Sequence, residues 1–328
     1  MVEPIITVVM PVYNTARYLP RTLESIFNQS IGVGMFKLIA IDDGSIDNSL
    51  SILRKYLQKF PDNMEVISKS NEGIGPTRNL GIERTTSKYI AFIDSDDYYD
   101  KEFLEKHVRK AEETRADIVS SGYKRINSKG KIIRAFTPKK ITEYTKYVTL
   151  SSCNRVHRLS FLKNNNIRFF TDTYVEDAPF SMLEIAKNAK FEFLNYTGYY
   201  WVYHEKSFSG TKMKLNSGQN QERAIEQLRL YVEMAPHLKE KPEFCYFMLK
   251  AVVHQFRQAR NGKVSDFMKH YRLGIDLLQD EVPSALRVKT LFGGKGDTLA
   301  VRMMIFAFLI MHKLHLIRVF AQIFCRTD

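Results

Sequence analysis

The fold is decided by the stretch Tyr89-Ile90-Ala91-Phe92-Ile93-Asp94-Ser95-Asp96-Asp97. Its first five residues are mostly apolar, too few for a free-standing helix, and they predict a strand buried on both faces. Three carboxylates follow at the strand end, and open α/β sheets hold their ligands at this edge. Carboxylate oxygens suit Mg²⁺ or Mn²⁺, so the stretch predicts a metal ion that carries a phosphate group. The alternative is an acidic turn in which Asp94 or Asp97 caps the next helix.

Strand, turn and helix alternate along about the first 120 residues. Apolar runs predict strands at residues 5–10, 38–41, 64–67, 88–93 and 118–123. Helical spacing and capping residues predict helices from Asn14 or Thr15 to residue 29, at 47–60, from Pro76, and at 101–114. This alternation predicts an α/β fold with a mostly parallel sheet that helices cover on both faces.

The pattern changes beyond residue 124. Gly130 predicts a hairpin, residues 138–160 show no clear period, and Glu176 or Asp177 begins a helix. Further strands are expected at 191–194 and 199–203, and helices at 216–234, 242–261, 264–279 and 297–325. The predicted organisation is therefore an α/β domain over residues 1–210 and a mainly helical region over residues 211–328.

The net charge of +13 is unevenly distributed along the 328 residues. Residues 1–100 contain 10 Lys and Arg against 13 Asp and Glu, so the remaining residues carry a net charge of +16. This excess predicts an anionic partner for the second half of the chain. The chain contains no basic run with interleaved aromatic residues and no Cys/His finger, which argues against nucleic acid and favours a membrane surface or a phosphorylated substrate.

Three widely spaced cysteines, Cys153, Cys245 and Cys325, predict neither a disulfide framework nor a Cys-x-x-Cys metal site. The amino terminus shows no signal-peptide pattern. Both features favour a reducing, cytoplasmic location. Gly73 and Gly75 superficially match a dinucleotide-binding loop, but their spacing and their place after the third strand argue against NAD.

Four elements, in the same order along the chain, resemble those of the family 2 glycosyltransferases, which have the GT-A fold and transfer a sugar from a nucleotide sugar to an acceptor. These elements are Val9-Met10-Pro11-Val12-Tyr13-Asn14, Ile41-Asp42-Asp43-Gly44-Ser45, Asn71-Glu72-Gly73 with Arg78-Asn79, and Asp94-Ser95-Asp96-Asp97. A fifth element, Glu176-Asp177, stands where the family has its catalytic acidic pair. The resemblance covers residues 5 to about 210.

The resemblance implies that Pro11 and Tyr13 line a pocket for the base, with Tyr13 stacking on it. Asp43 would accept a hydrogen bond from the imide N–H of uracil, which favours a UDP-sugar as the donor. Arg78 would reach a ribose, a phosphate or the sugar. A solvated helix arginine is the alternative for Arg78. Asn71 and Ser95 belong to the same implied donor-binding set.

The resemblance further implies that Asp94 binds the ribose and Asp96 the metal, Mn²⁺ or Mg²⁺. Asp97 is expected to cap the helix that follows. His204 would contribute a phosphate or metal contact, or else lie at the surface or along the acceptor.

For the reaction itself, the resemblance implies that Asp177 takes the proton from the acceptor hydroxyl in an inverting transfer, with Glu176 as its neighbour. Both residues also suit an ordinary helix start, and the two roles are compatible.

Residues 299–325 combine apolar runs with scattered basic side chains. The longest uninterrupted apolar run has nine residues, well short of the ~20 that span a bilayer. This composition is typical of an interfacial helix on an anionic membrane surface. A packing helix or the seam of a homo-oligomer is the alternative.

The residues and the resemblance together predict an inverting, metal-dependent glycosyltransferase. It would use a UDP-sugar and a saccharide or lipid-linked acceptor in bacterial surface-polysaccharide synthesis, in the cytoplasm on the inner face of the cell membrane. The alternatives are a nucleotidyltransferase and a non-catalytic nucleotide-sugar-binding module. The first strand is followed by Pro11-Val12-Tyr13-Asn14 rather than a Gly-rich basic loop, which disfavours the nucleotidyltransferase.

Overall fold

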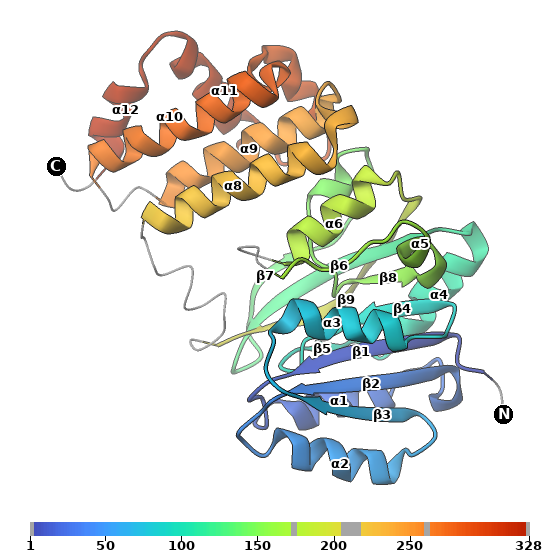
Figure 1. Cartoon of the computed structure of the whole chain (residues 1–328). Coiled ribbons are helices and arrows are strands. Elements are labelled where there is room, and N and C mark those ends of the chain that lie inside the picture. The colour runs from blue at the N-terminus through green and yellow to red at the C-terminus, as the bar shows by residue number, and fades with distance from the viewer. Residues whose placement is uncertain (1–2, 172–175, 205–217, 259–262, 326–328) are drawn as a thin grey trace. The chain divides into compact units, whose positions relative to one another are not determined.

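The computed structural model describes residues 3–171, 176–204, 218–258 and 263–325 (Figure 1). It divides into two compact units. The first runs to Lys139 and resumes at Ser151, and the second combines Lys140–Leu150 with the carboxyl-terminal helices. The predicted domain boundary near residue 210 lies outside the described residues and stays a prediction.

A single sheet of nine strands forms the centre of the first unit among the described residues, in the order β3-β2-β1-β4-β8-β6-β9-β5 with β7 beside β6. The strands are β1 (Ile6–Val12), β2 (Phe36–Asp43), β3 (Met64–Lys69), β4 (Tyr89–Phe92), β5 (Tyr98–Tyr99), β6 (Ile118–Asn127), β7 (Ile132–Phe136), β8 (Arg155–Arg158) and β9 (Phe191–Tyr203). The predicted α/β fold is confirmed. The strands β3, β2, β1 and β4 are parallel, whereas β8 runs antiparallel to both β4 and β6.

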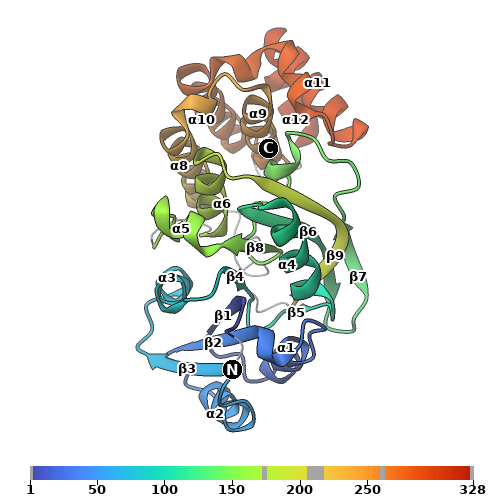
Figure 2. The same cartoon turned by 90° about the vertical axis from the view of Figure 1, so that its right-hand side faces the viewer.

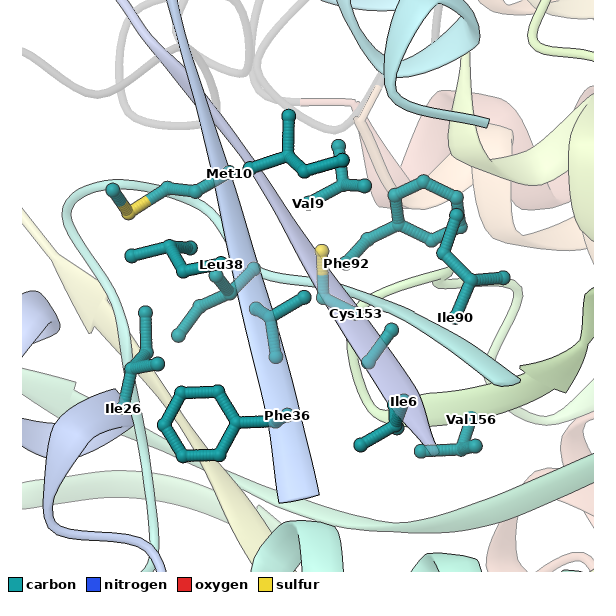
Figure 3. Close-up of a cluster of buried hydrophobic side chains, with 14 of the residues drawn as sticks. Ile6, Val9, Met10, Ile26, Phe36, Leu38, Ile90, Phe92, Cys153 and Val156 are labelled. Atoms are coloured by element: carbon teal, nitrogen blue, oxygen red, sulfur yellow. The ribbon is translucent and has the colours of Figure 1, made fainter. Parts of the chain in front are cut away.

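Helices pack on both faces of the sheet (Figure 2). The helices of this unit are α1 (Leu19–Phe27), α2 (Ser49–Lys59), α3 (Ile74–Arg84), α4 (Phe103–Thr114), α5 (Leu159–Asn164) and α6 (Asp177–Ala186). Ile26 of α1 lies with Met10, Leu38 and Phe36 in the buried core (Figure 3). The predicted start of α1 at Asn14 or Thr15 is wrong, because the Thr15 hydroxyl donates to Ser95 and the helix begins at Leu19.

α3 approaches the sheet closely at Gly81. A Cβ atom there would lie 2.2 Å from Cγ1 of Val9 in β1, so a larger residue would push the helix away. Arg78 lies one turn earlier on the same helix. The close approach therefore fixes how far Arg78 stands from the sheet.

The structure of this unit differs from the prediction at two strands, β9 and β8. The two strands expected at 191–194 and 199–203 form one strand, β9, whose register against β6 shifts around Gly122. Such irregularities let one long strand bend without ending. β8 was not predicted, since residues 138–160 show no period, and it occupies the central position between β4 and β6.

The second unit is helical, as predicted for the chain after the α/β domain. Its helices are α8 (Gly218–Met234), α9 (Pro242–Gln258), α10 (Val264–Glu281), α11 (Leu299–Lys313) and α12 (Ile317–Phe324). Tyr144, from the earlier segment, packs edge-on against Tyr246 of α9 at 5.0 Å between ring centroids. The single helix predicted over 297–325 is wrong, because His315 takes a positive φ of 57° and separates α11 from α12.

Candidate active site

The acidic residues 94–97 leave β4 at the carboxyl edge of the parallel strands, beside the ends of β1 and β2. The register pairs Val12 with Asp42, so β1 and β2 end together. Side chains that follow these strands therefore meet at one edge, where α/β folds hold ligands.

Arg78 joins three carboxylates from two distant segments. Its Nη2 lies 2.6 Å from Oδ1 of Asp94, and its Nη1 lies 2.8 Å from Oδ1 of Asp177 and 3.2 Å from Oε1 of Glu176. Arg78 is 1% exposed, so the interpretation as a solvated helix arginine is wrong. We call these four residues the Arg78 cluster. Within the described residues Arg78 pairs with these three carboxylates, and its contact with ribose, phosphate or sugar stays a prediction.

The electrostatics of the Arg78 cluster are unbalanced, because one guanidinium faces three carboxylates. Burial raises the pKa of Asp94 and of Asp177, while Arg78 opposes the rise in both. The same carboxylates hold the pKa of Arg78 well above its usual range against the effect of burial. A second cation at this edge would relieve the remaining repulsion.

Asp177 accepts both of its side-chain hydrogen bonds on one oxygen. Arg78 and the Ser152 hydroxyl, at 2.6 Å, donate to Oδ1. Among the described residues no hydrogen bond reaches Oδ2, and the side chain is 18% exposed. Oδ2 can therefore accept a proton from a bound molecule.

Asp96 and His204 lie together, although 108 positions separate them. Nε2 of His204 is 2.7 Å from Oδ2 of Asp96, and the imidazole stacks on Tyr18 at 4.7 Å between ring centroids. In the described part of the chain no group of three or more His, Cys, Asp or Glu is arranged to hold a metal ion. A pair suffices for Mg²⁺ or Mn²⁺ where phosphate oxygens and water complete the shell.

Asp43 ends β2 with a buried carboxylate. Oδ1 accepts from Lys69 and from the backbone N–H of Glu72 at 3.0 Å, and Oδ2 accepts from the N–H of Gly73 at 2.8 Å. The Gly73 and Glu72 amides thereby fix the predicted loop against the strand end. Since each carboxylate oxygen can accept two hydrogen bonds, Oδ2 keeps one position that no described residue fills.

The remaining predicted donor-binding residues lie around the same edge. Pro11 is buried in β1, and Tyr13 directly after β1 is 50% exposed. Asn71 is exposed, whereas the Ser95 hydroxyl is buried against Thr15. Tyr13 and Asn71 are thus accessible to a ligand, and the predicted contacts of all four residues stay predictions.

The prediction that Asp97 caps the next helix is wrong. Its carboxylate accepts hydrogen bonds from the backbone N–H of Val202 at 2.7 Å and from the hydroxyl of Tyr199, both in β9. Burial and the nearby Asp96 and Asp94 raise its pKa well above the usual range. Asp97 fastens β9 to the turn after β4, and this contact brings His204, at the end of β9, to Asp96.

Sequence reasoning missed four residues behind Asp177, namely Ser152, Arg155, His157 and Glu184. Arg155, His157 and Glu184 form a network, and each of these residues is at most 1% exposed. Glu184 accepts a hydrogen bond from Arg155 and pairs with His157, each at 2.6 Å. Three basic side chains within the aperiodic stretch 151–158, Arg155, His157 and Arg158, were the available signal. Glu184, the partner of Arg155 and His157, lies 29 and 27 residues further along the chain, which no local pattern indicates.

The chain is similar in sequence to proteins of one known family. The family model described as glycosyl transferase family 2 matches residues 7–182, slightly more than half of the chain. Poly(ribitol-phosphate) beta-glucosyltransferase of Bacillus spizizenii is 32% identical over 203 residues, which cover 60% of this chain and 32% of that protein. Poly(ribitol-phosphate) beta-N-acetylglucosaminyltransferase TarS of Staphylococcus aureus is 26% identical over 200 residues, with coverage of 60% and 35%. The match thus spans about a third of these relatives.

Two solved structures show the same fold. The crystal structure of S. aureus TarS in complex with UDP-GlcNAc matches with a TM-score of 0.57 at 21% identity, over 85% of this chain and 90% of that chain. Mannosyltransferase PcManGT of Pyrobaculum calidifontis, in complex with GDP-Man and Mn²⁺, matches with a TM-score of 0.57 at 14% identity, with coverage of 95% and 88%. The GT-A fold expected from the sequence is therefore confirmed.

Replacement of Arg78 should make stability strongly pH-dependent. A carboxyl group whose pKa is higher in the folded than in the unfolded protein contributes stability at pH values below its unfolded pKa of about 4. This contribution is lost as the pH rises through the pKa of the folded state. Arg78→Ala removes the cation that opposes the rise at Asp94 and Asp177. We expect a loss of about 3–5 kcal/mol at pH 8 and a smaller loss at pH 5, measured by urea unfolding without added metal.

The control for this prediction is Arg84→Ala, which removes an exposed arginine from the same helix. It should change stability by less than about 0.5 kcal/mol at both pH values. Equal losses for Arg78→Ala at pH 5 and pH 8 would contradict the electrostatic role of the Arg78 cluster.

Proposed function

The chain belongs to glycosyl transferase family 2, and on this premise we propose that it transfers a sugar from a UDP-sugar to a hydroxyl group of a saccharide or lipid-linked acceptor, with inversion. We further propose that the product is part of a bacterial cell-surface polymer. The observation that carries the proposal is Asp177, whose Oδ1 accepts from Arg78 and Ser152 while Oδ2 accepts no hydrogen bond from the described residues. The names of the relatives, which act on poly(ribitol-phosphate), support the polymer.

Asp177 is the base in this reaction. As the acceptor hydroxyl attacks the anomeric carbon, its proton passes to Oδ2, and the UDP group leaves from the opposite face of the sugar ring. Arg78 and Ser152 hold Oδ1, so only one oxygen is available for the proton. A base placed in this way is worth about 10²–10⁴ in rate.

The donor is bound by residues at the ends of β1 and β2. Tyr13 offers a half-exposed aromatic face for stacking on uracil, and Asp43 keeps one free acceptor position for the imide N–H. Lys69 forms an ion pair with the other oxygen of Asp43, Oδ1. The UDP-GlcNAc complex of TarS supports this donor class.

Asp96 and His204 would hold the divalent cation, Mn²⁺ or Mg²⁺. Their carboxylate and imidazole atoms lie 2.7 Å apart and both are metal-binding donors. The ion, when bound, would neutralise the charge that develops on the departing diphosphate. Tyr18 keeps the imidazole plane in place by stacking, and Asp97 fixes the strand that carries it.

We also propose that α11 and α12 bind an anionic membrane surface. Leu299, Met303, Phe306 and Ile310 are 37–73% exposed along α11, and no Asp or Glu occurs between Asp297 and Asp328. The opposite side of α11 is buried through Ile305, Phe308 and Leu309, as the packing alternative expects. No helix in the described residues is long and apolar enough to cross a membrane.

The proposed base is tested with Asp177→Asn, which keeps the shape of the side chain but cannot take a proton. We expect kcat for UDP release from a UDP-sugar in the presence of acceptor to fall by about 10²–10⁴, with KM for the donor unchanged. Glu176→Gln is the matched control and should keep most of the activity. Wild-type protein that binds UDP-sugars without releasing UDP would instead be a non-catalytic binding module.

The proposed metal site predicts that Asp96→Ala weakens Mn²⁺ binding at least about tenfold, measured by electron paramagnetic resonance in the presence of UDP. His204→Ala should weaken it in the same direction. Asp62→Ala, at an exposed acidic residue outside the site, is the control and should bind Mn²⁺ like the wild type. Full turnover after dialysis against EDTA would exclude the ion from the reaction.

The membrane proposal predicts that vesicles containing anionic lipid sediment the protein at low salt and release much of it at high salt, because each nearby Lys or Arg adds roughly 1 kcal/mol. The triple variant Leu299→Ser, Met303→Ser, Ile310→Ser should lose binding. The control Ile132→Ser, Ile133→Ser removes two exposed apolar side chains from β7. Equal sedimentation of both variants would assign the α11 face to packing or assembly.

A further inference from the structure

Ser152 stands directly behind the proposed base. It precedes β8, is fully buried, and its hydroxyl donates to Oδ1 of Asp177 at 2.6 Å. Nη1 of Arg78 donates to the same oxygen at 2.8 Å. Two donors on one oxygen leave the carboxylate no freedom to rotate about its last bond without breaking both hydrogen bonds.

The position of Ser152 is itself fixed by the buried network of Arg155, His157 and Glu184. Nε2 of His157 lies 3.2 Å from the backbone carbonyl oxygen of Ser152, and Nδ1 lies 2.6 Å from Oε1 of Glu184. Glu184 is seven residues after Asp177 on α6, so both side chains lie on the same face of this helix. The network therefore ties the helix that carries the base to the residue that holds the base.

We propose that Ser152 is a positioning residue, which fixes the Asp177 carboxylate so that Oδ2 alone faces the acceptor hydroxyl. This inference rests on the proposed function, since it needs Asp177 to be the base. In the step, the acceptor oxygen forms its bond to the anomeric carbon and gives its proton to Oδ2. The bond from the anomeric carbon to the diphosphate breaks, and UDP leaves with the electron pair.

The charges around Asp177 give the sign of a pH effect. The titratable groups that face Asp177 come from four places in the fold. Arg78 lies on α3, Asp94 at the end of β4 and Glu176 at the start of α6, while Cys153 and Arg155 lie in the region of β8. The Ser152 hydroxyl bonds to the ionised form and so lowers the pKa of Asp177, against the rise caused by burial. Without this hydroxyl the pKa rises further, and the base ionises only at higher pH.

The test is Ser152→Ala, assayed for UDP-sugar turnover across pH. We expect kcat to fall about tenfold, the donor KM to stay unchanged, and the acid limb of the kcat profile to move to higher pH. Ser152→Thr keeps a hydroxyl and should restore the limb towards the wild-type position. Ser152→Cys keeps the size with a weaker donor, and it repeats the test if Ser152→Ala does not fold.

The matched control is Ser181→Ala on α6, because the Ser181 hydroxyl is also buried but has no hydrogen-bond partner among the described residues. The acid limb of the kcat profile of Ser181→Ala should stay at the same pH as in the wild type. The positioning role would be overturned if the acid limb of the kcat profile in Ser152→Ala stayed at its wild-type pH, or if Ser152→Ala and Ser181→Ala changed kcat equally. Either outcome would leave the proposed function standing. Full kcat in Asp177→Asn would instead remove Asp177 as the base and the proposed function with it.

Discussion

The candidate active site depends on one buried guanidinium that three carboxylates share. Arg78 comes from α3, Asp94 from the turn after β4, and Glu176 and Asp177 from the start of α6, so this contact fixes three segments relative to one another. Buried ion pairs recover little net free energy, since desolvation consumes most of the attraction. The value of the Arg78 cluster lies in geometry. An arginine presents its donors in a fixed planar fork, which a lysine cannot imitate.

Charge compensation differs between the carboxylates of this edge. Asp43 has Lys69 and two backbone amides, and Asp94 and Asp177 share Arg78. Asp96, in contrast, is paired in the described structure with the imidazole of His204 and not with a Lys or Arg side chain. A carboxylate and an imidazole at hydrogen-bond distance accommodate a divalent cation more readily than a carboxylate already bound to an ammonium group. This difference supports Asp96 as the metal ligand and Asp94 as a member of the Arg78 cluster.

The sequence predicted the two strands β2 and β4, because each is an apolar run that leads directly into carboxylates, Asp42 and Asp43 or Asp94. It did not predict the layer behind the edge. β8 has four residues, Arg155 to Arg158, of which three are charged or titratable, and such a stretch looks like a solvated loop. Two of these side chains, Arg155 and His157, are buried with Glu184 of α6 as their partner, and Asp97 likewise finds its partners more than a hundred residues away in β9. Local periodicity carries no information about such partners, since only the tertiary fold brings them together.

The carboxyl-terminal segment was interpreted as a helix on a membrane surface or as a packing or oligomer element, and α11 has one buried face and one exposed apolar face. Ile305, Phe308 and Leu309 are buried in the helical unit, while the residues at spacings of three and four on the other side remain exposed. Full burial of an exposed Leu, Met, Phe or Ile is worth about 1.5–3 kcal/mol, and side chains already half covered gain correspondingly less. With roughly 1 kcal/mol more from each nearby Lys or Arg, the sum suits a reversible association that salt weakens. The left-handed residue His315 ends α11 and separates it from α12, which has exposed apolar residues of its own, Val319 and Ile323.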